Sequence, residues 1–223
     1  MEARDPPLLR SRVYGFLRRI FTHEVDASLL AWCREQDRLG LWSELQLDLK
    51  EVLNAADSEA ALEQLAVDFC QLFITSGAWG SPHASVQVQT LAEDGGEFLL
   101  WGDPASAVKR LYHEAGFELE EEAHLLPDAL GVEFEFMERL CHEESVAKQA
   151  GGSTDVQRLQ DLQRRMLKEH LARWVPAYGR KLKSRASTDF YRAMTDLAAD
   201  FVEWDAREER ATEANASPGT GSA

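Results

Sequence analysis

Cysteine is scarce in this sequence of 223 residues, and the three that occur lie far apart. No Cys-x-x-Cys pair and no cluster of cysteine with histidine is present, so neither a disulfide framework nor a zinc site is expected. Cys70 and Cys141 fall within helical apolar patterns, and we interpret them as small core residues. The third is Cys33. Free thiols in this number are typical of a protein from a reducing compartment.

Long apolar runs are also absent from the sequence. No stretch approaches the roughly 20 apolar residues that are required to span a bilayer. Residues 1–12 contain charges and prolines but no apolar core of the kind found in secretory signals. Both absences predict a cytoplasmic protein without a membrane span.

Basic residues are outnumbered, with 24 lysines and arginines against 39 aspartates and glutamates and a formal net charge of −15. Such a balance argues against nucleic acid as a partner, because phosphate backbones are bound by clustered lysine and arginine. Two interpretations of the acidity remain open. It is either a solvated surface that keeps the protein soluble, or a feature that favours a basic partner segment.

What the sequence does contain is helical periodicity along nearly its whole length. No alternating strand pattern of useful length and no internal repeat interrupts it. We therefore predict an all-α protein, a single globular helical domain of about eight to ten helices with a long ordered central loop. The domain is expected to cover residues 1–205. A disordered acidic tail is expected over residues 206–223, which lack large apolar side chains.

The first half of the chain is expected to form four helices. Apolar faces predict them over residues 9–20, 26–39, 41–52 and 62–73, the last following Asp57 and Ser58 as candidate caps. Glycines and a proline then break the pattern over residues 75–103, and long loops of this kind are often functional. Within that loop, residues 85–91 could be extended.

The second half carries clear helix start and stop signals. They are, in chain order, Asp103 as N-cap before Pro104, Gly116 as a stop, Pro127 as a start, residues 153–155 as caps, Pro176 as a kink or restart, and Ser187 or Thr188 as the last cap.

Templates for catalysis each fail on a named requirement. A carboxylate-bridged metal pair needs Glu-x-x-His on two helices, and this sequence has a single copy at Glu121 and His124. Glu138 and His142 lie at helical i,i+4 spacing and are more simply a surface pair. No glycine-rich phosphate loop of known form occurs, and no nucleophile stands in a recognisable setting. The sequence therefore predicts a protein that is not an enzyme, with no cofactor and no metal.

Aromatic residues near the central loop favour a binding module instead. Phe69 and Phe73 are expected in the core, whereas Trp79 and Trp101 stand among glycines, where exposure is easier. Grooves lined by aromatic and aliphatic side chains bind apolar or amphipathic peptide helices. These residues therefore point weakly to peptide binding.

Six groups of residues follow one another in a familiar order. They are Phe69-Cys-Gln-Leu72-Phe73, Ser81-Pro82-His83-Ala84-Ser85, Trp101-Gly102, Tyr112-x-x-x-Gly116, Pro127-Asp128-Ala129-Leu130 with Phe136-Met137, and His170-Leu171-x-x-Trp174-x-Pro176 with Phe190-Tyr191. Together they resemble the signatures of the TorD/DmsD/NarJ family of molybdoenzyme-specific chaperones. The resemblance covers nearly the whole folded chain, from about residue 8 to residue 201.

The resemblance implies a cytoplasmic chaperone for the catalytic subunit of a DMSO-reductase-type molybdenum-dependent oxidoreductase. Such proteins bind the twin-arginine signal peptide or another segment of the immature subunit, assist insertion of the molybdenum cofactor, and withhold the subunit from export until then. That subunit and its signal peptide are thus the implied partners, and proteins of molybdenum cofactor biosynthesis are further candidates. Monomers and domain-swapped dimers both occur in the family. The residues implied to surround the client-binding groove are Phe69, Leu72, Phe73, Trp79, Pro82, Ser85, Trp101, Pro127 and Asp128.

Two departures from the family pattern indicate a divergent branch with a different client. Ala129 stands where members commonly have histidine, so no role of that imidazole carries over. The loop Pro82-His83-Ala84-Ser85 also differs from the Pro-Tyr-Glu-Ser type. Asp128 is expected either to contact the client or to cap the helix after Pro127. Two alternatives for the function remain, an adaptor for a partner helix with no link to molybdenum, and an enzyme or nucleotide-binding protein.

Overall fold

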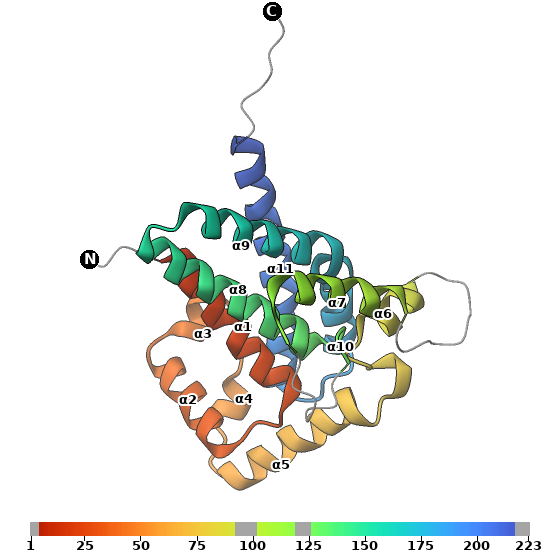
Figure 1. The fold of residues 1–223 in the computed structure, drawn as a ribbon. Helices are drawn as coiled ribbons and strands as arrows, with labels where there is room; N and C mark the ends of the chain where they lie inside the picture. Colours follow the sequence, from red (N-terminus) through yellow and green to blue (C-terminus); the bar gives the residue numbers. More distant parts are fainter. Residues whose placement is uncertain (1–4, 92–101, 119–125, 217–223) are drawn as a thin grey trace, which may run out of the picture.

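The computed structural model describes residues 5–91, 102–118 and 126–216. In these residues the regular structure is helical and no β-strand forms, apart from one isolated antiparallel bridge between His83 and Ala129 (Figure 1). The predicted all-α, single-domain fold is confirmed. No helix within the described ranges is long and apolar enough to cross a membrane.

Two pairs of closely packed helices form the centre of the fold. Helix α1 (Pro6–Thr22) lies along α8 (Leu130–Ala150), and α10 (Ala172–Lys183) lies along α11 (Asp189–Ala216) (Figure 1). Glycines permit both approaches, since a Cβ at Gly131 would collide with the side chain of Thr22 and one at Gly179 would lie 2.6 Å from the backbone oxygen of Thr195. The largest side chains buried in this core are Trp174, Tyr14, Tyr112, Tyr178, Tyr191, Phe134, Phe136 and Phe190.

Two of the N-terminal helices begin at an aspartate cap, and the cap at Asp57 was predicted. The Asp26 carboxylate accepts the Leu29 amide at the start of α2 (Ala27–Arg38), and Asp57 accepts two amides at the start of α5 (Ser58–Phe69). The continuous helix expected over residues 41–52 is wrong. Two short helices, α3 (Leu41–Glu44) and α4 (Lys50–Leu53), take its place, separated by a turn with Gln46 at a φ of 58°.

The central region is more helical than the sequence suggested. Helix α5 continues into a π-helical turn, η1 (Cys70–Ile74), which is followed by a 3₁₀ turn, η2 (Gly77–Trp79), and by α6 (Ala84–Leu91). The prediction that residues 85–91 are extended is therefore wrong. Helix α7 (Asp103–Ala115) begins at Asp103 itself, with Gly102 as the N-cap, and ends at Gly116 with a φ of 68°, as expected.

The start of α8 also differs from the prediction. Residues 127–129 form a turn, and the helix begins at Leu130 rather than at Pro127. Backbone bonds tie this turn to the start of α6, since the Ala84 amide donates to Asp128 O at 2.9 Å and the Leu130 amide donates to Pro82 O at 2.8 Å. These two hydrogen bonds hold residues 127–129 outside the helix, so that α8 begins at Leu130.

The C-terminal helices form one long, articulated run. Helix α9 (Ser153–Met166) passes through a π-helical turn, η4 (Leu167–Leu171), into α10, which contains Pro176. The wider turn comes just before the proline, which cannot donate a backbone hydrogen bond. Thr188 caps α11 as predicted, because its hydroxyl accepts the Tyr191 amide at 3.2 Å. That helix extends to Ala216, so residues 206–216 are helical rather than part of a disordered tail.

Candidate peptide-binding groove

A groove of about 1250 Å³ lies between α1, the α5–η1 helix and the start of α8. Nine of its twenty lining residues are aromatic or aliphatic, and they form the surface that apolar peptide side chains require, while ten others are polar or charged. Phe69 and Phe73 come from α5 and η1, with ring centroids 5.0 Å apart, and Phe73 meets Phe21 of α1 at 5.6 Å. Ile74, with 67% of its surface exposed, stands at the edge.

Charged residues surround this apolar surface, and most are paired. Arg18 binds Glu138 at 2.8 Å across α1 and α8, and Arg139 binds Glu143 at 2.8 Å. Glu135 also lines the groove, is exposed, and forms no ion pair with any residue that the structure describes. Its carboxylate is therefore free to receive a cationic group from a bound segment.

The sequence-derived site residues separate into three sets. Three of them, Phe69, Phe73 and Pro82, line the groove. Four others do not line it and are buried in the surrounding structure, namely Leu72, Ser85, Pro127 and Asp128. Trp79 lies outside the groove, and Trp101 lies outside the described residues. The structure thus brings together a third of the expected set.

Asp128 supports the groove without lining it. Its side chain is fully buried, and one carboxylate oxygen accepts the Ser85 amide at 2.7 Å, which caps the start of α6. The interpretation that it caps the helix after Pro127 is therefore wrong, since the helix that it caps is α6. Its other oxygen has no hydrogen-bond partner among the described residues but is also buried, so a direct contact with a client would require the surrounding turn to move.

Trp79 lies outside the groove and attaches the η2 turn to the C-terminal part of α10 and the residues that follow it. Arg185 lies over its ring at 4.0 Å from the centroid, and the Lys181 ammonium lies at 5.1 Å. Lys181 also donates to Gln87 Oε1 at 2.9 Å, and the Gln87 amide donates to Ser81 O at 2.8 Å. These contacts fix the connection between α5 and α6 onto α10.

Sequence reasoning missed several groove residues, notably Phe21, Phe117 and Glu135. Phe21 lies on the buried face of α1, where core and groove residues share one pattern. Phe117 follows the Gly116 stop, and Arg139 lies over its ring at 5.7 Å. Glu135 follows the quoted Pro-Asp motif by seven residues, and its exposure within a mostly buried helix is the signal that could have identified it.

Glu133 is a residue of helix α8 whose carboxyl group is buried. The Trp174 indole N–H donates to its Oε2 at 3.2 Å, while its other oxygen has no hydrogen-bond partner in the described part of the chain. Burial, together with the nearby charge of Asp128, raises the pKa of Glu133 well above its usual value. This shift favours the protonated form of the Glu133 carboxyl in the folded protein over the unfolded chain.

Glu133→Gln is therefore expected to be more stable than the parent protein, by a difference that grows as the pH rises. Above about pH 4.5 the unfolded carboxyl ionises but the folded one does not, so the parent loses up to about 1.4 kcal/mol per pH unit until its folded pKa is reached. The variant escapes this loss, because glutamine stays neutral and retains an acceptor for Trp174. Urea unfolding at several pH values measures the difference, with the exposed Glu135→Gln as the control. A stability difference that does not change with pH would contradict the assignment.

Comparisons with known proteins show the family of this chain. The family model described as "Nitrate reductase delta subunit" matches residues 39–178. The chaperone protein TorD of Vibrio cholerae is 28% identical over 207 residues, which covers 88% of this chain and 90% of the relative. The chaperone protein TorD of Shewanella pealeana is 24% identical over 209 residues, or 89% and 88% of the two chains. The similarity to these relatives therefore covers most of the chain.

Proposed function

The chain belongs to the nitrate reductase delta subunit family, and on that premise we propose that it is the cytoplasmic chaperone of one molybdoenzyme. Its relatives named chaperone protein TorD belong to a family of chaperones, not enzymes. In our proposal the chain binds the immature catalytic subunit of a DMSO-reductase-type enzyme, assists molybdenum cofactor insertion, and holds the subunit until twin-arginine export.

The observation that carries this proposal is the combination of an aromatic groove with an unpaired carboxylate. A twin-arginine signal peptide joins a pair of arginines to an apolar stretch. Phe21, Phe69 and Phe73 offer an apolar surface for that stretch, and Glu135 offers a charge-assisted hydrogen bond to a guanidinium. The formal net charge of −15 would additionally speed the encounter with a basic segment.

The test begins with affinity capture from cells of the natural host grown with tungstate, which blocks formation of active molybdenum cofactor. The expected result is recovery of an apo molybdoenzyme catalytic subunit with the chain. A synthetic peptide that reproduces the N-terminal segment of that subunit is then titrated against the protein. Recovery of a partner unrelated to molybdenum would instead favour an adaptor function.

Glu135→Lys is expected to weaken binding of this peptide about tenfold or more, because it replaces attraction for the arginines with repulsion. Isothermal titration measures the change. Glu169→Lys is the matched control, since Glu169 is also exposed on a helical turn but does not line this groove. Equal affinities for the two variants, at equal melting temperatures, would remove Glu135 from the binding site.

A further inference from the structure

A second, smaller groove of about 490 Å³ lies on the other side of α5. It is bounded by α4, α5 and the start of α11, through Val52, Val67 and Thr188 among others. The peptide-binding groove uses Phe69 and Phe73 of the same α5–η1 helix. One helix therefore separates the two grooves.

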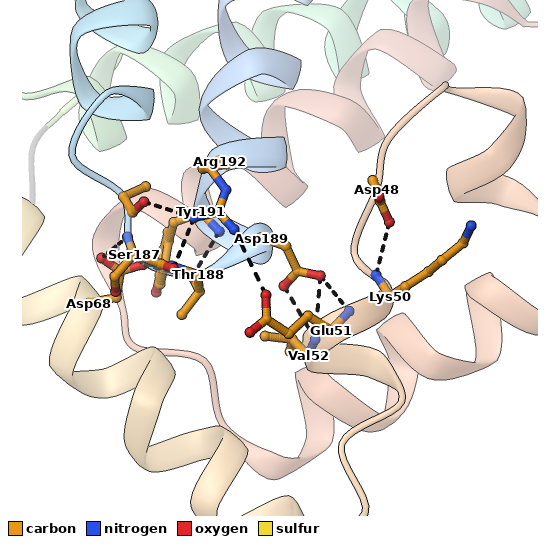
Figure 2. Close-up of polar contacts among 11 residues, drawn as sticks. Asp48, Lys50, Glu51, Val52, Asp68, Ser187, Thr188, Asp189, Tyr191 and Arg192 are labelled. Carbon is orange, nitrogen blue, oxygen red and sulfur yellow. Dashed lines mark hydrogen bonds and ion pairs between the residues drawn. The ribbon is translucent and has the colours of Figure 1, made fainter.

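The floor of this second groove is held rigid by two carboxylates (Figure 2). Asp68 of α5 accepts the Thr188 amide at 2.8 Å and the Thr188 hydroxyl at 2.7 Å. Asp189 of α11 accepts the amides of Glu51 and Val52 in α4, at 2.6 and 3.3 Å. The three helices are thus tied together around the groove, which reduces the ordering that a ligand would have to induce.

The charge on the walls has one sign. Glu51 and Glu63 are the charged residues that line the groove, and both are acidic. Glu51 is 77% exposed and meets Arg192 only at 3.9 Å, while Glu63 forms no ion pair among the described parts of the chain. Among the basic residues nearby, Arg34 donates to Leu53 O and Ala55 O at 3.0 and 3.1 Å, and Arg192 donates to Ala186 O and Ser187 O at 3.1 and 2.9 Å. A cationic ligand is therefore complementary to this surface.

An exposed stripe on α5 supplies the apolar part of the surface. On α5 its residues Ala60, Gln64 and Val67 recur at spacings of four and three, which is the spacing that an α-helix presents to a second helix packed along it, and Gln71 and Ile74 extend the stripe onto η1. Val67 is 51% exposed and Ile74 is 67% exposed. Ile74 also lines the peptide-binding groove, so the stripe leads directly from one groove to the other. The exposed residues of the stripe are Ala60, Gln64, Val67, Gln71 and Ile74.

We propose that this groove and stripe bind a basic amphipathic helix of the client subunit, outside the segment that fills the first groove. The proposal rests on the proposed function. Charge complementarity selects a helix with lysine or arginine beside a small aliphatic residue. Continuity through Ile74 places its occupant on the same client, because the two grooves lie within roughly 20 Å along α5. Bivalent attachment of this kind strengthens binding without requiring a tight contact at either site.

The experiment compares Val67→Lys with Val146→Lys. Val146 is 52% exposed on α8 and lines neither groove, so the two substitutions are matched in chemistry and exposure. Affinity is measured for the apo catalytic subunit and for the synthetic peptide of its N-terminal segment. Val67→Lys is expected to weaken binding of the subunit at least fivefold and to leave peptide binding unchanged. Val146→Lys is expected to change neither affinity.

The outcomes separate this proposal from the proposed function. If Val67→Lys binds the subunit as well as Val146→Lys does, while Glu135→Lys weakens both subunit and peptide, the second site is excluded and the chaperone function stands. If Val67→Lys weakens the peptide as much as the subunit, the stripe belongs to the first groove and the second site is also excluded. Failure of the parent protein to bind the subunit at all would overturn both proposals.

Discussion

Asp205→Ala is expected to lower the free energy of unfolding by about 3 kcal/mol or more, because it removes the closer and more deeply buried of the two carboxylates that pair with the Arg10 guanidinium. The Arg10 side chain is 11% exposed and that of Asp205 is 1% exposed, with Nε and Oδ1 at 2.6 Å. The Tyr14 hydroxyl also donates to Asp205 at 2.5 Å, and Arg10 donates to Gln163 at 2.7 Å. The substitution therefore disrupts contacts among α1, α9 and α11 together.

Chemical unfolding of the parent and of two comparison variants measures this effect. Asp200→Ala, on the exposed face of the same helix, should change stability by no more than about 0.5 kcal/mol. Asp205→Asn keeps an acceptor for Tyr14 but removes the charge opposite Arg10, so it should fall between the two. A loss for Asp205→Ala no larger than that for Asp200→Ala would show that the pair contributes nothing to stability.

The same cluster explains why the sequence misplaced the end of the domain. Residues 206–216 are polar, and composition alone favours disorder. In the structure Glu209 reaches Arg10 at 3.2 Å, and burial beside Asp205 raises the pKa of the Glu209 carboxyl even though Arg10 lowers it. This contact joins α1 to α11 across about 200 residues. No local pattern in the sequence predicts this contact.

Local signals predicted the helices well where the caps are local. Asp26, Asp57 and Thr188 each bind an amide two or three residues ahead, which is a pattern visible in the sequence. Helix α4 is different, since Asp189 of α11 accepts the Glu51 amide at 2.6 Å, in addition to the local Asp48, which accepts the Lys50 amide at 3.3 Å. The apolar spacing over residues 41–52 therefore suggested one helix, although the chain turns at Gln46.

The residues of the candidate groove also divide into those that the sequence predicted and those that it did not. Motif order found Phe69, Phe73 and Pro82, because these residues belong to the signatures that resemble the family. It did not find Phe21 or Glu135, whose position depends on how α1 packs against α8. Asp128 was identified as important, but its bond to the Ser85 amide spans 43 residues and could not be derived from spacing. Helical periodicity thus predicts which residues are buried, and tertiary packing decides which of them a partner can reach.

Asp68→Ala is expected to lower the free energy of unfolding by about 3 kcal/mol or more, because it removes a second buried carboxylate. Asp68 is fully buried on α5 and accepts the amides of Ser187 and Thr188 as well as the Thr188 hydroxyl (Figure 2). Alanine would leave these donors unpaired at the start of α11 and open a small cavity. The cost therefore exceeds the roughly 1 kcal/mol of an ordinary exposed cap.

Asp57→Ala provides the matched comparison, since Asp57 also accepts two amides at a helix start but does so in solvent. Thermal and urea unfolding of both variants should give a loss for Asp68→Ala at least twice that for Asp57→Ala. Peptide affinity should fall as well, because Asp68 adjoins Phe69, whose ring lies 6.3 Å from that of Tyr191 on α11. Equal losses in the two variants would mean that burial adds nothing to this cap. Unchanged peptide affinity would mean that the groove does not depend on the tie between α5 and α11.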